Sequence, residues 1–206
     1  MANAGSTASK NRDAFAGKKV FALIGGIASG KTAVSDILGE LGAYIIDADV
    51  ISRSVTAPGS EGERAMMLAF PDCVENGSLS RRLVREKVFN DGQALETLNG
   101  ITHPLIIKEI HRQVAEASGV AVVVMPVPVE LRRYNAVLNV YAPREVRIAR
   151  LIKRDNIDRA LAEKIMAAQM TDEQAEAVAD FTFVNDGDEA KLCQAVVNWW
   201  NIYIEN

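Results

Sequence analysis

The residues best suited to chemistry form one glycine-rich segment near the beginning of the chain. Residues 25–32 read GGIASGKT and match the pattern G-x-x-x-x-G-K-[ST] at every defined position. Glycines let successive backbone N–H groups turn inward and bind an anion, and the N-terminus of a following helix adds positive potential. In such a loop a lysine binds the β- and γ-phosphates and a hydroxyl ligates Mg²⁺, which are the roles expected for Lys31 and Thr32. The segment therefore predicts a nucleoside-triphosphate site.

The expected nucleotide-binding residues belong to this loop and to the position directly after it. The alternative is a glycine-rich turn between a strand and a helix with a chance Lys-Thr pair. The motif by itself does not distinguish a kinase from a GTPase, an ATPase or a nucleotide-dependent switch, so the acceptor side has to decide. The expected set is Gly25, Gly26, Ala28, Ser29, Gly30, Lys31, Thr32 and Ala33.

Two carboxylates follow the next apolar segment. Asp47 and Asp49 come directly after residues 44–46, which read YII. In a parallel sheet, ligands bind beyond the carboxyl ends of the strands, so one crevice is expected to receive both the loop and these carboxylates. We expect one of them to face the water shell of a metal ion and the other to face an acceptor hydroxyl. The alternative is that an aspartate here caps the following helix.

Three arginines near residue 150 are spaced for one helix face. Arg147, Arg150 and Arg154 lie three and four residues apart. Bidentate guanidinium groups can neutralise the oxygens of a phosphoryl group in transfer, and we expect this role first for Arg154. The alternative is a solvated face with ion pairs such as Arg150–Asp155 or Arg154–Asp158.

The elements that must position these residues alternate along the chain. Short apolar runs alternate with helical stripes, which predicts an α/β protein with a five-stranded, mainly parallel sheet flanked by helices. A polar, helical interval at about 58–118 interrupts the alternation and is expected to be an insertion. The expected strands are 20–24, 44–46, 120–125, 136–141 and 181–184, and the expected helices include 34–41, 143–154 and 192–204.

The composition is that of one ordinary globular protein. The chain has 206 residues, 49% of them hydrophobic and 24% charged, with a formal charge of −4, which argues against nucleic-acid binding. The longest apolar stretch, 120–129, is too short to span a bilayer. Residues 1–19 are expected to be a flexible tail or a cloning remnant. Cys73 and Cys193 fit no metal spacing and indicate reduced thiols, hence a cytoplasmic location.

From about residue 20 to its end, the chain resembles the dephospho-CoA kinase family. The resemblance rests on residues 25–32, on LGAYIIDADVISR at 41–53, on 83–106 with its THPLI segment, and on 150–187. The second and third blocks are far more specific than the loop. The resemblance implies a P-loop, nucleoside-monophosphate-kinase-like fold. Its parts would be a core of 20–57 and 119–206, a helical acceptor-binding insertion at about 58–118, and a lid at about 147–170.

The resemblance also implies a reaction, in which ATP phosphorylates the ribose 3′-hydroxyl of dephospho-CoA and Mg²⁺ assists. Asp49 would orient or deprotonate the hydroxyl, and Arg53 and His103 would lie toward the acceptor, with His103 just before a helix. Lys31 and Arg154 would complete the catalytic group. The partners would be these two substrates, with no nucleic acid and no membrane, in a monomer or weak homo-oligomer. The chain departs from the family pattern at Ala28, Val124 and Pro128.

Two other functions stay open from the residues themselves. One is a different small-molecule kinase that acts on a nucleotide or a sugar-like acid. The other is a nucleotide-dependent switch without transfer activity. A GTPase switch would carry a guanine-reading Asn-Lys-x-Asp segment, and the sequence contains none.

Overall fold

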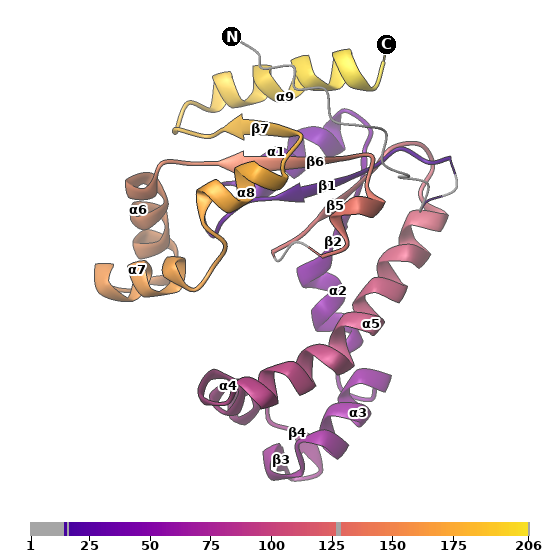
Figure 1. Ribbon diagram of the computed structural model, residues 1–206, viewed down its shortest axis with the longest axis vertical. Helices are drawn as coiled ribbons and strands as arrows, with labels where there is room; N and C mark the ends of the chain where they lie inside the picture. Colours follow the sequence, from indigo (N-terminus) through magenta and orange to yellow (C-terminus); the bar gives the residue numbers. More distant parts are fainter. Residues whose placement is uncertain (1–14, 16, 127–128, 206) are drawn as a thin grey trace. The chain divides into compact units, whose positions relative to one another are not determined.

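A computed structural model describes residue 15 and residues 17–126 and 129–205 (Figure 1). The described residues form two compact units. The first combines the chain up to Ile45 with the chain from Ala117 onward, and the second is the continuous stretch Ile46–Glu116. The second unit contains most of the interval expected as an insertion. It also includes residues 46–57, which were expected to belong to the core. Pro128, one of the departures from the family pattern, lies outside the described residues.

The main sheet confirms the expected architecture. Its five strands run in the order β2-β5-β1-β6-β7. Strand β1 pairs in parallel with both β5 and β6, and β6 pairs in parallel with β7. Every residue of β1 is buried, which explains its continuous apolar run. The bounds are β1 Val20–Ile24, β2 Tyr44–Asp47, β5 Ala121–Val124, β6 Ala136–Tyr141 and β7 Phe181–Val184.

Three helices of the first unit begin where the sequence supplies a capping side chain. Thr171 and Gln174 form a capping box at the start of α8, and Asp158 and Asp188 cap α7 and α9. Helix α1 begins at Lys31, within the glycine-rich segment. The bounds are α1 Lys31–Glu40, α6 Arg144–Asp155, α7 Arg159–Ala167, α8 Asp172–Val178 and α9 Glu189–Tyr203, with a short 3₁₀ helix at Leu131–Arg133.

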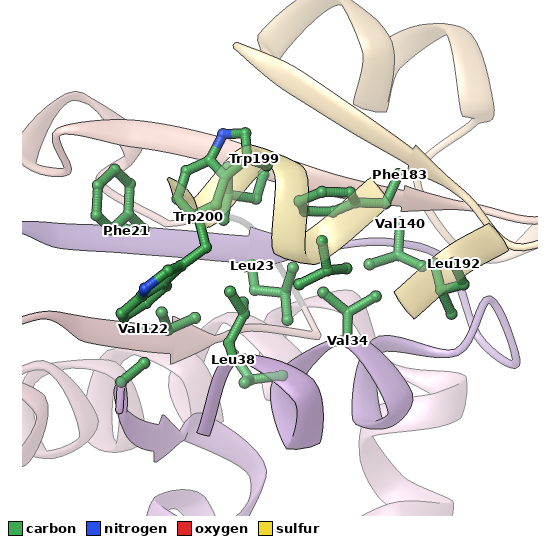
Figure 2. Close-up of a cluster of buried hydrophobic side chains, with 14 residues drawn as sticks. Phe21, Leu23, Val34, Leu38, Val122, Val140, Phe183, Leu192, Trp199 and Trp200 are labelled. Atoms are coloured by element: carbon green, nitrogen blue, oxygen red, sulfur yellow. The ribbon is translucent and has the colours of Figure 1, made fainter. Parts of the chain in front are cut away.

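The core of this unit lies between the sheet and the helices α1 and α9 (Figure 2). Val34 and Leu38 of α1 are fully buried there, and Trp199 of α9 is 3% exposed. Its ring meets Phe21 of β1 edge-on at 5.1 Å between ring centroids, a favourable aromatic geometry. The glycine-rich loop, which joins β1 to α1, therefore begins and ends on well-packed elements.

The second unit is mainly helical and has a small core of its own. Met66, Phe70 and Val84 are among its buried residues. A hairpin was not expected from the sequence, because each of its strands has only two residues. Asn76 and Gly77 form its turn with φ values of 51° and 79°. The bounds are α2 Ala48–Val55, α3 Glu61–Ala69, a 3₁₀ helix at Pro71–Cys73, β3 Val74–Glu75, β4 Ser78–Leu79, α4 Arg81–Asn90 and α5 Gly92–Glu116.

The expected start of a helix after His103 and Pro104 is wrong. Both residues lie inside the 25-residue helix α5. A proline interrupts a helix because it lacks an N–H group and its ring crowds the carbonyl four residues earlier. Here the carbonyl four residues earlier belongs to Gly100 of the same helix. The helix nevertheless continues through Pro104, although proline usually marks a helix boundary.

The beginning of the chain is only partly described. Residues 1–14 and 16, most of the expected tail, lie outside the described residues. Within that segment, however, Phe15 is buried against the ring of Tyr134, with centroids 5.5 Å apart. Lys18 donates a hydrogen bond from Nζ to the Ala117 carbonyl at 2.7 Å. None of the described helices has the length and apolar character needed to cross a membrane.

Candidate active site

The glycine-rich loop lies where the sequence places it, between the carboxyl end of β1 and the first turn of α1. Gly25 and Gly30 have φ values of 151° and 100°, which only glycine adopts readily. A side chain on Gly30 would also collide with the amide of Asn185. Ala28 has a φ of 59°, a left-handed conformation that costs an L-residue about 1 kcal/mol. The chain therefore keeps the backbone curl at this position without glycine.

Polar side chains of the loop suit a phosphate ligand. Lys31 donates from Nζ to the carbonyls of Gly25 at 2.7 Å and Gly26 at 3.4 Å, so its charge lies at the beginning of the loop. The Ser29 side chain is buried, and its Oγ has no hydrogen-bond partner among the described residues. A buried hydroxyl without a partner is costly. A phosphate oxygen in the loop would supply the missing acceptor.

The protein groups available for Mg²⁺ are few, and they fit that ion. Within the described part of the chain, no three His, Cys, Asp or Glu side chains come together as a metal site. Mg²⁺ keeps several waters and usually takes one or two protein ligands together with substrate phosphates. Thr32 is exposed in the first turn of α1 and offers one such hydroxyl. Its position suits an ion that arrives with the nucleotide.

Side chains from α6 and from the segment after α7 hold the first half of the loop. Arg147 donates from Nε to the Ile27 carbonyl at 3.0 Å. The Ile27 N–H donates to Oε1 of Gln169 at 2.7 Å. Both backbone polar groups of Ile27 are therefore bound by side chains more than a hundred residues away in the sequence.

The second half of the loop is held in the same manner. Arg150 donates from Nη1 to the Ala28 carbonyl at 3.2 Å and from Nη2 to Oδ1 of Asn185 at 2.9 Å. Asn185, which follows β7, donates from Nδ2 to the Ser29 carbonyl at 2.9 Å. These contacts between the protein's own groups fix the curl of the loop.

Arg154, the arginine expected first at the phosphates, has a different contact in this structure. It forms a bidentate ion pair with Asp155, at 2.7 Å and 2.8 Å, and its side chain is 58% exposed. The hydrogen bond from Arg154 lowers the pKa of Asp155, and the same bond raises the pKa of Arg154. The pairs considered from the sequence, Arg150–Asp155 and Arg154–Asp158, are not the ones that form; Asp158 caps α7 instead.

Asp47 takes the capping role considered as an alternative. It is the N-cap of α2, and its Oδ1 accepts from the backbone N–H groups of Asp49 at 2.7 Å and Val50 at 3.1 Å. Asp49 is exposed in the first turn of α2, and its carboxylate has no hydrogen-bond partner among the described residues. Of the two carboxylates, Asp49 is the one whose side chain is available to a ligand.

We expect Asp47→Ala to lower the free energy of unfolding by about 1 kcal/mol, because two N–H groups of α2 lose their acceptor. Urea denaturation measures this loss. Asp47→Asn is the matched control, since an asparagine oxygen also caps helices well. An equal loss in both variants would show that capping is not the source of the effect.

The two residues expected toward the acceptor both lie in the second unit. Arg53 is in the last turn of α2 and donates from Nε to the Asp49 carbonyl at 3.2 Å. His103 is exposed on α5.

The roles of Gln169 and Asn185 were not predicted from the sequence, although both residues stand in the segments that carry the family resemblance. Asp172, which pairs with Arg147, gave no signal in the sequence.

Comparison with known protein families gives one consistent result. A sequence model of the family described as dephospho-CoA kinase matches residues 19–191. The chain is 42% identical over 183 residues to a dephospho-CoA kinase of Burkholderia lata, covering 85% of this chain and 91% of that one. It is 40% identical over 177 residues to one of Aromatoleum aromaticum, covering 82% and 86%. A relative from Mycolicibacterium paratuberculosis is 39% identical over 87% of this chain, which spans about half (46%) of that protein.

Solved structures agree on the fold. TT1252 from Thermus thermophilus superposes with a TM-score of 0.81 at 24% identity, covering 90% of this chain and 98% of that one. A shikimate kinase from Acinetobacter baumannii superposes with a TM-score of 0.51 at 18% identity, covering 91% and 96%. At these identities the likeness concerns the fold, which is that of P-loop kinases.

Proposed function

The chain belongs to the family of dephospho-CoA kinases, which phosphorylate dephospho-CoA in the last step of coenzyme A biosynthesis, and we propose that it does so at the ribose 3′-hydroxyl with ATP as donor. The observation that carries the proposal is the family match over residues 19–191, and it is supported by a glycine-rich loop whose curl is held by side chains from distant parts of the chain. The products would be coenzyme A and ADP.

The loop would bind the β- and γ-phosphates through its backbone N–H groups. Lys31, whose Nζ lies at the beginning of the loop, would bind these phosphates, and Ser29 would gain an acceptor for its buried hydroxyl. The Thr32 hydroxyl would hold Mg²⁺, with Asp47 a further partner through water. The ion, when bound, neutralises charge on the phosphate oxygens. Phosphoryl transfer asks little covalent chemistry of a protein, so these positioning and electrostatic contributions account for most of the rate.

On the acceptor side, Asp49 would accept the proton of the 3′-hydroxyl. The 3′-oxygen then forms a bond to the γ-phosphorus while the bond from that phosphorus to the β–γ bridging oxygen breaks, which releases ADP. Arg53 and His103 would contact the acceptor, and Arg154 would neutralise charge on the transferred group. Closure of a lid at about 147–170 would exclude water and so prevent ATP hydrolysis.

The proposal also covers the setting of the reaction. We place it in the cytoplasm, with the protein a monomer or a weak homo-oligomer and without nucleic-acid or membrane partners. The formal charge of −4 supports the absence of a nucleic-acid partner.

A transfer assay with [γ-³²P]ATP and Mg²⁺ tests the function directly. The acceptors are dephospho-CoA, a nucleoside monophosphate and shikimate, each at equal concentration. We expect label in coenzyme A and at most trace label in the other two acceptors. Label transferred mainly to another acceptor would assign the chain to a different small-molecule kinase activity. Binding of ATP without transfer to any acceptor would favour a nucleotide-dependent switch.

A further inference from the structure

A nearly buried arginine with a half-exposed ion-pair partner lies against the glycine-rich loop. Arg147 is 4% exposed, and its Nη1 lies 2.8 Å from Oδ1 of Asp172, the first residue of α8. Its Nε donates to the Ile27 carbonyl. Its Nη2 lies so close to Gly26 that any side chain on that glycine would collide with it. The guanidinium group is thus fixed on the loop by contacts on two sides.

Asp172 compensates only part of the buried positive charge of Arg147. Burying a guanidinium group costs free energy unless its charge and its donors are satisfied. Asp172 is 41% exposed, so part of its interaction with Arg147 is weakened by solvent. Nη2 has no hydrogen-bond partner among the described residues, and it is not among the buried side-chain atoms left without one there, so it keeps some contact with solvent. An anion held in the loop beside Gly26 would complete both the charge and the hydrogen bonding of Arg147.

The position of Lys31 indicates which phosphate this anion is. Its Nζ lies against the carbonyls of Gly25 and Gly26, the same end of the loop that Nη2 of Arg147 covers. The lysine of such a loop binds the β- and γ-phosphates. Two cations therefore meet at the beginning of the loop, where the terminal phosphates of a triphosphate are bound.

We propose that Arg147 binds the terminal phosphate of ATP and that Asp172 is its positioning residue. The inference rests on the proposed function, because it takes ATP as the donor. It adds to the loop a cation whose place is fixed by the protein's own contacts, whereas Arg154 is exposed and paired with its neighbour. Asp172 acts only through Arg147, by holding the guanidinium plane against Gly26.

A purely structural role for Arg147 predicts different behaviour. The Ile27 N–H stays bound to Gln169 when Arg147 is removed, so the loop keeps one of its two contacts at that residue. If Arg147 served only to hold the loop, its loss would weaken ATP and ADP alike, since the same loop binds both. If it binds the terminal phosphate, its loss weakens ATP more than ADP.

The first experiment titrates ATP and ADP, each with Mg²⁺ and without acceptor, into Arg147→Gln, Arg147→Lys and the unaltered protein. A hydrogen bond to a charged group is worth about 10- to 100-fold in binding, so Arg147→Gln is expected to raise the Kd for ATP by about that factor. The Kd for ADP should rise less than about 3-fold. Arg147→Lys keeps the charge without the planar fork and should recover part of the ATP affinity.

The matched control is Arg144→Gln. Arg144 lies on the same helix and lines the same cavity of about 230 Å³ as Arg147, but it is 56% exposed and pairs with Glu145 and Glu163 at the surface. It should leave both affinities unchanged. Equal losses of ATP and ADP affinity in Arg147→Gln would overturn the proposal, as would an equal effect in Arg144→Gln.

The second experiment tests Asp172 by a double-mutant cycle. Asp172→Asn should lower the ratio of ATP to ADP affinity about 3- to 10-fold when Arg147 is present, and should have no effect in the Arg147→Gln background. The same change in both backgrounds would show that Asp172 does not act through Arg147. Thermal unfolding of every variant identifies any that fails to fold. Because no titration contains dephospho-CoA, these results stand apart from the success or failure of the transfer assay.

Discussion

Asp49→Asn is expected to lower turnover with dephospho-CoA by about 10²- to 10⁴-fold, which is the usual contribution of general acid–base catalysis. Asparagine keeps the size of the side chain and can still orient the hydroxyl, but it cannot accept the proton. The Asp49 carboxylate is exposed, and none of the described residues forms a hydrogen bond with it. Steady-state kinetics give turnover, and titration with ATP in the absence of acceptor shows whether donor binding survives the substitution.

The expected pattern for Asp49→Asn is loss of turnover with ATP affinity retained. Asp36→Asn is a suitable control, because Asp36 is an exposed aspartate on α1 with no assigned role and the substitution changes the net charge equally. Unchanged turnover in Asp49→Asn would refute the assignment. An equal fall in the control would attribute the effect to net charge.

Arg154→Ala is expected to lower the rate of transfer about 10³-fold, the contribution of an arginine that neutralises a phosphoryl group in transfer. For this role the guanidinium must leave Asp155, with which it forms its bidentate pair. The pair is exposed, and exposed ion pairs contribute little stability, so the exchange of one oxyanion partner for another costs little. Single-turnover kinetics with saturating ATP measure the transfer step itself.

Lys153→Ala controls for the loss of one positive charge from the same helix, since Lys153 is an exposed neighbour with no assigned role. It should leave the rate unchanged. A rate within about 3-fold of the unaltered protein in Arg154→Ala would remove Arg154 from the catalytic group. In that event Arg147, which already lies against the loop, would be the main arginine at the phosphates.

The sheet could be predicted from the sequence because its signals are local. Strand β1 is a continuous apolar run that ends in two glycines, and β6 and β7 were predicted at their observed bounds. The hairpin β3–β4 could not be predicted, since strands of two residues have no periodicity. Only its Asn76-Gly77 turn is visible in the sequence.

The sequence suggested which residues would surround the glycine-rich loop, but it could not show their contacts. Spacing placed Arg147, Arg150 and Arg154 on one helix face, and it could not say which of them reaches the loop. That depends on how the first turns of α6 lie against a loop 120 residues earlier. Asp172 and Asn185 were not assigned roles for the same reason, because their partners are distant in the sequence.

The contacts on the glycine-rich loop also determine the order in which the nucleotide site can form during synthesis. Strand β1 leaves the ribosome early, but its two neighbours in the sheet, β5 and β6, follow about a hundred residues later. The side chains that hold Ile27 and Ser29 come later still, from residues 147 to 185. A nascent chain that ends before α6 therefore carries the whole motif without the groups that shape it. The part of the site that is translated first is among the last to reach its native form.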